Sequence, residues 1–474
     1  MTTCLFAIYF NYFVDKFWND EFLFRFVLVF VWITYLWESF LSYRQYKVYT
    51  NVTTIPPDFV GVLDQKTFTK ARLYSIDKSK FGFVSKLWSQ LLTTAILLSN
   101  IIPYLWNISG DLLRSFDYNS KSEIPQTLVF ILIGSLVSSL LDLPWSLYYT
   151  FVIEERYGFN NQTLGFYFKD KLKKFVVSQA IMNPIIAAVI YIIHIGGDYF
   201  FIYLWAFCSV IVFLFMTIYA DYIAPLFDKF VPLPEGELRT KIEELALSLN
   251  FPLKKLYVVE NSKRSSHSNA YLYGVHKNKR IVLFDTLLQD YTPSDERDEK
   301  KKENDEKLAN DGDENKAKEK KNKGVSNPEI VAILAHELGH WKLNHVLKNI
   351  FITEINMFLC FACFGLLYQN PVVYSAFGFF NERPVFIGLI LIFQYIFSPY
   401  NEILSFLMTC LSRRFEFQAD AFAKQLNKAS DLRSAVIKLN ADNLSFPIYD
   451  RLYSAWYLSH PPLLERVQAL GKLD

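Results

Sequence analysis

The heptapeptide Ala335-His336-Glu337-Leu338-Gly339-His340-Trp341 contains the most informative pattern in this chain. Its His-Glu-x-x-His spacing places two imidazoles one turn apart on the same face of a helix, with a carboxylate beside them. Two neutral imidazoles in that arrangement can share one metal ion, and Glu337 can then take a proton from the bound water. The pattern predicts a zinc-activated hydrolase. The alternative is an amphipathic helix that carries histidines on its surface.

The residues before the motif indicate where its helix begins. Ser326-Asn327-Pro328-Glu329 has the form of a capping box, and an apolar run from Ile330 to Leu334 follows it. We therefore expect both histidines to lie on one helix.

A later segment, Arg413 to Phe422, supplies a candidate for the third metal ligand. Glu416 and Asp420 again lie one helical turn apart. Glu416 would complete a tripod with the two histidines and leave the fourth position open for water, as catalytic zinc requires. Asp420 could accept the other ring N–H of a ligating histidine. The alternative for this pair is a solvated acidic helix face.

Composition predicts that most of the chain lies in a membrane. Hydrophobic residues make up 52% of the 474 residues and charged residues 20%, and the apolar residues are gathered into long blocks. Each block is near the ~20 residues that a bilayer core demands. Polar residues inside the blocks, such as Glu354 and Glu402, are expected to face a protein interior or a water-filled cavity. The predicted spans are Phe22–Tyr43, Leu87–Trp106, Thr127–Ile153, Phe175–Ile195, Phe200–Ile223, Val346–Tyr368 and Val385–Leu411.

The distribution of Lys and Arg predicts the orientation in the membrane, because these residues concentrate on the cytoplasmic side. They gather in Arg44–Lys86, Arg156–Lys174 and Asp228–Lys348, whereas residues 196–198 and 369–383 carry almost none. The placement that fits every loop has a lumenal or external N-terminus and a cytosolic C-terminus. The first span is expected to be an uncleaved anchor, because no basic region precedes it.

The segment between the fifth and sixth spans reads as a small α+β domain on the cytosolic face. Glu235–Asn250 has the pattern of an amphipathic helix. Leu256–Val259 and Ile281–Phe284 are predicted strands, with Ser268–Gly274 as a third strand between them. An exposed edge strand there could pair with an extended substrate. Ser294–Gly324 alternates Lys, Glu, Asp and Asn, which predicts a disordered insertion, with a partner-docking segment as the alternative.

Charge and cysteine usage exclude two further classes. A net charge of +2 without a basic, aromatic-interleaved patch argues against a nucleic-acid partner. The number of cysteines, five, is odd and implies no disulfide framework. Cys360 and Cys363 form a C-x-x-C inside a predicted span, where helix packing explains them better than redox or metal chemistry.

With these residues in view, the chain resembles the type I CaaX prenyl endopeptidases, membrane zinc metalloproteases of the endoplasmic reticulum that include the prelamin A-processing type. The resemblance covers essentially the whole chain. It rests on His336-Glu337-x-x-His340-Trp341, on Arg413-Arg414-x-Glu416-x-Gln418-Ala419-Asp420 and on Ser459-His460-Pro461-Pro462-Leu463-Leu464-Glu465-Arg466, in that order.

The resemblance implies a mainly α fold: a seven-span transmembrane helical barrel that encloses a chamber, with a small cytosolic α+β zinc metalloprotease domain. It places the protein in the endoplasmic reticulum membrane, with the inner nuclear membrane as a second candidate location. The expected division is spans one to five in 1–225, the first part of the metalloprotease domain in 226–345, spans six and seven in 346–411, and its second part, with the third ligand, in 412–474.

The resemblance also implies residue roles. His336, His340 and Glu416 would bind one catalytic Zn²⁺, and Glu337 would be the general base. It assigns His460 to stabilising the tetrahedral intermediate and Arg466 to a position near the site.

For residues outside the metal-binding motifs, the resemblance says more than the sequence alone does. It takes Asn269 as a contact to the substrate backbone. From the sequence alone, His460 could be a simple loop histidine and Asn269 a residue at a turn or strand end. His194, His276 and His345 match no motif and are expected to be structural.

The predicted function is removal of the last three residues from isoprenylated CaaX proteins, with a second, prelamin-type cleavage left open. The expected partners are prenylated substrates and the lipid bilayer. One rival is an intramembrane protease with its motif inside a spanning helix, which Lys342 and Asn344 directly after the motif disfavour. A second rival is a non-enzymatic scaffold, which the intact ligand candidates and base disfavour.

Overall fold

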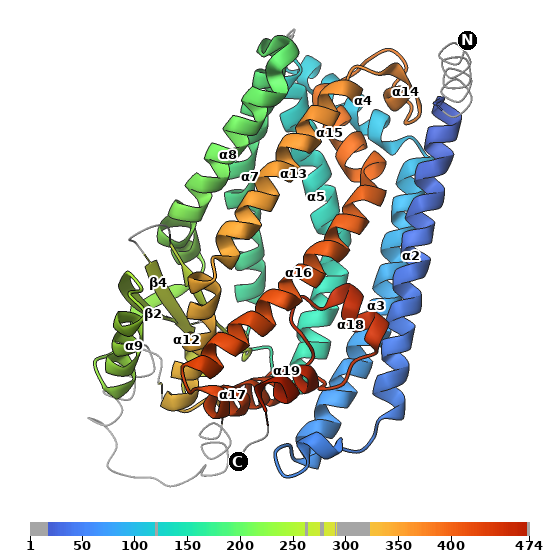
Figure 1. Cartoon of the computed structure of the whole chain (residues 1–474). Helices are drawn as coiled ribbons and strands as arrows, with labels where there is room; N and C mark the ends of the chain where they lie inside the picture. Colours follow the sequence, from blue (N-terminus) through green and yellow to red (C-terminus); the bar gives the residue numbers. More distant parts are fainter. Residues whose placement is uncertain are drawn as a thin grey trace, which may run out of the picture.

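The structure is a computed structural model that describes residues 18–118, 122–260, 264–274, 279–289, 291 and 323–471. Long helices stand side by side, and a small sheet with several shorter helices lies at one end of them (Figure 1). The predicted insertion Ser294–Gly324 lies outside the described residues except for its last two, and His276 and Cys4 also lie outside them.

Six helices are long and apolar enough to cross a membrane. A seventh candidate is a pair of helical segments, Val385–Ile396 (α15 and η7) and Ser398–Gln425 (α16), which meet at a bend of 60°. Seven predicted spans agree with this set if the bent pair is one span. The six are α2 (Asp20–Asn51), α3 (Gln65–Leu98), α5 continuing into α6 (Ile124–Tyr157), α7 (Leu164–Ile195), α8 with the turn before it (Gly197–Ile218) and α13 (His345–Leu367).

The predicted bounds of two spans were wrong. Leu87–Trp106 is not one helix, because α3 ends at Leu98 and Asn100 adopts a left-handed conformation with φ 51° before α4 (Ile101–Ser115) begins. Asparagine tolerates this conformation better than most residues, so it can separate two helices inside an apolar run. Val385–Leu411 is broken near Phe397, where Pro399 in the first turn of α16 cannot supply a backbone N–H.

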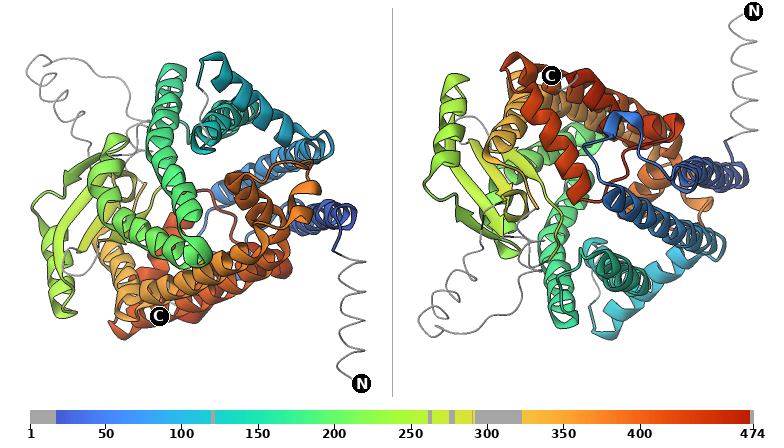
Figure 2. Two further views of the ribbon diagram at one scale, coloured as in Figure 1. Left: turned by 90° about the horizontal axis from the view of Figure 1, so that it is seen from above. Right: turned by 90° about the horizontal axis from the view of Figure 1, so that it is seen from below.

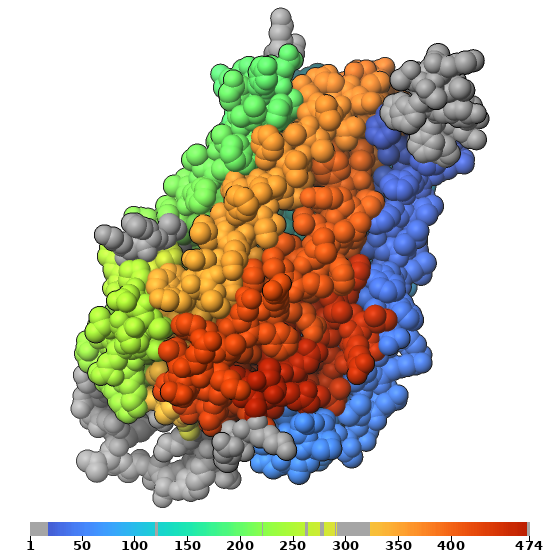
Figure 3. Space-filling view, viewed as in Figure 1, coloured from blue at the N-terminus to red at the C-terminus, as the bar shows by residue number. Residues whose placement is uncertain are grey.

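The membrane helices bury little of their surface against one another outside a cluster that α4, α14 and α15 help to form. Neighbours in contact are α2 with α3, α5 with α7, α7 with α8, α8 with α13, and α16 with α2. Only 6–11% of the most apolar window of each of the six spans is buried, whereas a helix in a packed bundle buries a whole face. Views along the helices show their ribbons arranged in a ring (Figure 2). The space-filling view shows an opening between α13 and the α15–α16 segments, through which the far wall is visible (Figure 3).

The sheet has four strands in the order β1-β2-β4-β3. The three predicted strands are confirmed as β2 (Leu253–Glu260), β3 (Ala270–Tyr273) and β4 (Lys279–Phe284), and β1 (Lys229–Pro232) was not predicted. β2 and β4 are parallel, whereas β3 pairs antiparallel with β4 and occupies the edge. One edge of β3 is thus left without a strand partner among the described residues.

The helix that carries the motif lies in the core of the soluble part. It is α12 (Asn327–Lys342), and its start has the predicted capping box between Ser326 and Glu329. It contacts α16, α17 (Ala429–Asp442) and the predicted amphipathic helix, confirmed as α9 (Glu237–Ser248). Every residue from Glu329 to His336 is buried, so α12 is held on several sides. The chain ends in α18 (Arg451–Tyr457) and α19 (Leu463–Leu470).

Candidate active site

The candidate site forms where α12 and α16 approach each other closely. Gly339 on α12 faces α16 so tightly that an added Cβ would lie 3.2 Å from the Cα of Ala419 and 3.1 Å from the ring of Phe422. A larger residue at position 339 would push the two helices apart. Because Gly339 lies between the two motif histidines, this close approach brings their imidazoles to the carboxylates of α16.

His336, His340 and Glu416 converge on one point. Their candidate ligand atoms lie within 4.8 Å of one another. The Nε2 atoms of the two histidines are 3.2 Å apart, and they lie 3.4 Å and 3.3 Å from the two oxygens of Glu416. Two imidazoles and one carboxylate form a donor set that suits zinc, and three protein ligands leave room for water.

Two observations test whether this group fits a divalent cation. First, Oε2 of Glu416 is buried and accepts no hydrogen bond, although Glu416 lies beside the imidazoles of His336 and His340. Second, burial alone would lower the pKa of His336, but the hydrogen bond to Asp420 and the nearby carboxylate of Glu416 outweigh it and raise that pKa to about 9. The buried surroundings of His336 therefore favour positive charge, which a metal ion would supply in place of a proton. The residues fit a metal.

Asp420 contacts the ring of His336, and Arg466 in turn contacts Asp420. Asp420 Oδ1 lies 2.8 Å from His336 Nδ1, so the carboxylate can accept the ring N–H and leave the lone pair of Nε2 for a metal ion. Arg466, on α19, donates to both oxygens of Asp420 at 2.9 and 2.6 Å. The side chain of Asp420 is only 1% exposed and that of Arg466 only 13%. Arg466 thus fixes the residue that orients His336.

Glu337 follows His336 on α12 and is half-buried. Burial raises its pKa above the usual range for a glutamate, while the nearby charges of His336 and His340 oppose that shift. A carboxylate with a raised pKa takes a proton more readily near neutral pH, which suits a general base. Glu337 therefore lies close to the ligand group without being one of its members.

His460 approaches the same group from the loop between α18 and α19. Its Nε2 is 3.4 Å from Glu416 Oε1, and its side chain is 70% exposed. His460 therefore borders the ligand group on its open side, where a substrate could reach it.

One contact was not expected from the sequence. His345, at the start of α13, places its Nδ1 3.0 Å from Nδ1 of His340, and its Nε2 is 2.9 Å from the side-chain oxygen of Gln418. Its ring also stacks on Phe415 at 4.1 Å. His345 thus contacts Nδ1 of His340, as Asp420 contacts Nδ1 of His336. Its spacing of five residues from His340 gives no helical signal, because Asn344 turns the chain with φ 57° between the two helices.

Asn269 directly precedes the edge strand β3 and is exposed. Its side-chain oxygen accepts from the N–H of Ala270 at 2.8 Å, and its backbone oxygen accepts from Phe284 on β4 at 3.0 Å. The side-chain amide nitrogen has no partner among the described residues. It is therefore free to contact an extended chain lying along β3.

The motif helix packs within the soluble part of the fold. α12 contacts α9, α17 and β3, and it is not among the candidate spans found in the described residues. This packing disfavours the rival interpretation in which the histidines lie inside a spanning helix.

Known proteins match most of the length of this chain. Residues 45–229 match the family model described as CAAX prenyl protease N-terminal, five membrane helices, and residues 232–474 match peptidase family M48. The CAAX prenyl protease 1 homolog of Homo sapiens is 56% identical and covers 96% of this chain and 98% of its own. CAAX prenyl protease 1 of Saccharomyces cerevisiae is 36% identical, covering 91% and 92%. The crystal structure of S. mikatae Ste24p matches with a TM-score of 0.81 at 35% identity, covering 94% of this chain and 98% of that one.

Proposed function

This chain belongs to the CAAX prenyl proteases of peptidase family M48, and we propose that it is a zinc endopeptidase that removes the last three residues from isoprenylated CaaX proteins. The observation that carries the proposal is the convergence of His336, His340 and Glu416 within 4.8 Å at the end of a membrane barrel. A prenylated tail requires both parts, because its lipid belongs in the membrane and its peptide bond must reach the ligand group.

His336, His340 and Glu416 would hold the zinc ion. When bound, zinc polarises the scissile carbonyl and makes water acidic enough to supply a nucleophile at neutral pH. Glu337 then accepts the proton of the attacking water and passes it to the leaving amine. His460, at the open side of the group, donates to the oxyanion that develops on the substrate.

Three further residues position the substrate or a metal ligand. Asn269 contacts the substrate backbone as the tail pairs with the edge strand β3. Arg466 holds Asp420, and Asp420 holds the ring of His336. The metalloprotease domain is formed from 226–345 and 412–474, on either side of spans six and seven.

The proposed location is the endoplasmic reticulum membrane, with the N-terminus lumenal and the C-terminus cytosolic. The support is the concentration of Lys and Arg in the loops on the side of the sheet domain. In this orientation the candidate site faces the cytosolic end of the barrel, where prenylated tails arrive.

A farnesylated CaaX peptide should be cleaved with a kcat/KM at least about tenfold above that of its unprenylated counterpart. Each buried methylene contributes ~0.8 kcal/mol, so even partial burial of the farnesyl chain exceeds the ~1.4 kcal/mol that a tenfold change requires. The measurement compares both peptides in the same detergent and locates the cut by mass spectrometry, expected directly after the modified cysteine. A strong zinc chelator should stop both reactions.

Equal rates on the two peptides would contradict the CaaX assignment and leave a general membrane metalloprotease. No cleavage of either peptide by the metal-loaded protein would contradict the peptidase assignment itself.

Asp420→Asn should weaken zinc binding by about 10–100-fold, because the variant no longer offers a charged acceptor to the ring N–H of His336. Competition with a chromophoric chelator measures the affinity. Asp198→Asn is the matched control, since Asp198 is exposed in the turn before α8. Unchanged affinity in Asp420→Asn would show that Asp420 does not support the metal.

A further inference from the structure

A pocket of about 340 Å³ lies between α2, α3 and the segment that joins α17 to α19. Asn443 lines it and also bonds the residue before Asn269: its Oδ1 accepts from the N–H of Ser268 at 3.0 Å, and its Nδ2 donates to the carbonyl of Ser268 at 3.3 Å. Leu458, two residues before His460, also lines the pocket. The pocket therefore borders both the beginning of the edge strand and the loop of His460.

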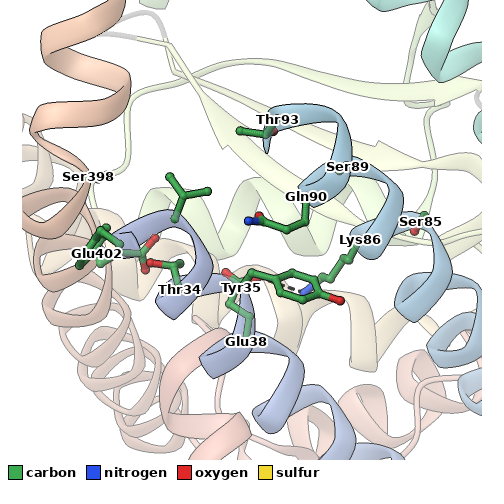
Figure 4. Close-up of a pocket in the computed structure, with 12 residues that line it drawn as sticks. Thr34, Tyr35, Glu38, Ser85, Lys86, Ser89, Gln90, Thr93, Ser398 and Glu402 are labelled. Carbon is green, nitrogen blue, oxygen red and sulfur yellow. Dashed lines mark hydrogen bonds and ion pairs between the residues drawn. The ribbon is translucent and has the colours of Figure 1, made fainter. Parts of the chain in front are cut away.

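Two lysines of α3 line this pocket, and they differ in what they contact. Lys86 Nζ lies 3.2 Å from Glu38. Lys86 also lines a neighbouring pocket of about 370 Å³ farther along α2 and α3, which Glu38 and Glu402 line as well (Figure 4). Lys78 is exposed to the pocket, with its Nζ 4.7 Å from the ring centroid of Tyr74. Among the described residues Lys78 forms no ion pair.

The carboxylate of Glu154, whose charge acts on Lys78, already has other partners. The charge of Glu154 reaches Lys78, but its Oε1 accepts from the hydroxyl of Tyr74 and its Oε2 lies 3.2 Å from Nε2 of His267. Lys78 therefore lines the pocket without a carboxylate paired to it among the described residues. An ammonium in a partly enclosed pocket binds a carboxylate more strongly than it does in open water.

The direction of a bound substrate brings its end to this pocket. A chain that adds antiparallel to β3 continues the pattern of β3 with β4 and runs from the side of Tyr273 toward Asn269 and Ser268. Its C-terminus then points to the region that Asn443 connects to the pocket. Three extended residues beyond the cut reach about 10 Å, so the chain end lies near the site but not in it.

We propose that Lys78 binds the terminal carboxylate of the substrate tail in this pocket. The inference rests on the proposed function and names the terminal carboxylate as the group by which the enzyme recognises the substrate tail. A fixed anchor for the chain end, three residues past the scissile bond, would set where the bond is cut. A carboxylate at the chain end, rather than a side-chain acid, is the chemical group that this position recognises.

The test uses one farnesylated CaaX peptide in two forms, with a free C-terminal carboxylate and with a C-terminal amide. The unchanged enzyme should cleave the acid with a kcat/KM about tenfold or more above that of the amide, because the amide cannot form the charged pair. Lys78→Gln should lower the rate on the acid to the level of the amide, and Lys78→Arg should restore most of the preference. Lys80→Gln, an exposed lysine on the same helix that lines neither pocket, should keep the full preference.

Equal cleavage of acid and amide by the unchanged enzyme would overturn the carboxylate site and leave the proposed function intact. A Lys78→Gln variant that loses activity equally on both peptides, with the acid preference preserved, would show a structural role and would also overturn it. Failure of the unchanged enzyme to cleave either peptide would overturn the proposed function together with this inference.

Discussion

Glu337→Gln should lower the rate of peptide hydrolysis by about 10²–10⁴-fold while leaving zinc bound. The glutamine keeps the size of the side chain but cannot accept the proton of the attacking water. The ligand group is untouched, since its atoms come from His336, His340 and Glu416, and Glu337 is not a member of it. Single-turnover hydrolysis of the farnesylated peptide and elemental analysis of the same preparation measure the two effects.

The control for this result is Glu243→Gln, which makes the same chemical change on α9, where the side chain is 52% exposed and pairs with Arg239. That variant should keep both zinc and activity. If Glu337→Gln retained substantial turnover, another group would have to take the proton. If it lost zinc, the two effects could not be separated and the assigned role would fail.

The soluble part of the fold was predictable because its signals are local. The capping box at Ser326 and the alternation in Leu256–Val259 act over a few residues, and the structure has α12 and β2 at those places. β1 was missed because it has four residues and contains Pro232 at its end. The membrane helices were found by composition, but a hydropathy pattern marks the apolar part of a helix and not its ends. That is why α3, which continues from Leu98 back to Gln65 through many polar residues, was placed too late in the chain.

The candidate site was predictable as a set of residue types but not as a set of contacts. The i, i+4 spacing of His336 with His340 and of Glu416 with Asp420 defines two helix faces, and zinc chemistry suggests that they meet. Nothing local predicts the contact of His345 with His340, because it depends on how the chain turns at Asn344. The pocket of Lys78 likewise depends on packing between segments hundreds of residues apart, α3 and the region after α17.

The two halves of the ligand group come from parts of the chain that are separated by membrane segments. His336 and His340 lie on α12, whereas Glu416 lies on α16, after α13 and the bent pair that begins at Val385. A bound metal ion would therefore connect segments that the membrane passes keep apart in sequence. Such a ligand stabilises the folded state by an amount that grows with the logarithm of the ratio of its concentration to its dissociation constant, about 2.7 kcal/mol at a hundredfold excess.

Glu416→Gln should therefore lose both zinc and activity, and its melting temperature should no longer respond to added zinc. A neutral amide is a poor replacement for the carboxylate, and two imidazoles alone do not form a catalytic zinc site. We expect zinc content to fall from about one ion per chain to below about a tenth, with hydrolysis of the farnesylated peptide falling in parallel. Elemental analysis, a thermal unfolding curve with and without zinc, and the peptide assay measure the three effects.

His194→Gln is the control, because it removes an imidazole at the end of α7, where His194 lies 3.8 Å from Glu123 and far along the chain from both ligand helices. That variant should bind zinc and gain stability from it as the unchanged protein does. A Glu416→Gln protein that still held one zinc ion per chain would mean that a different residue completes the site, and His460, 3.4 Å from Glu416, would be the first to examine.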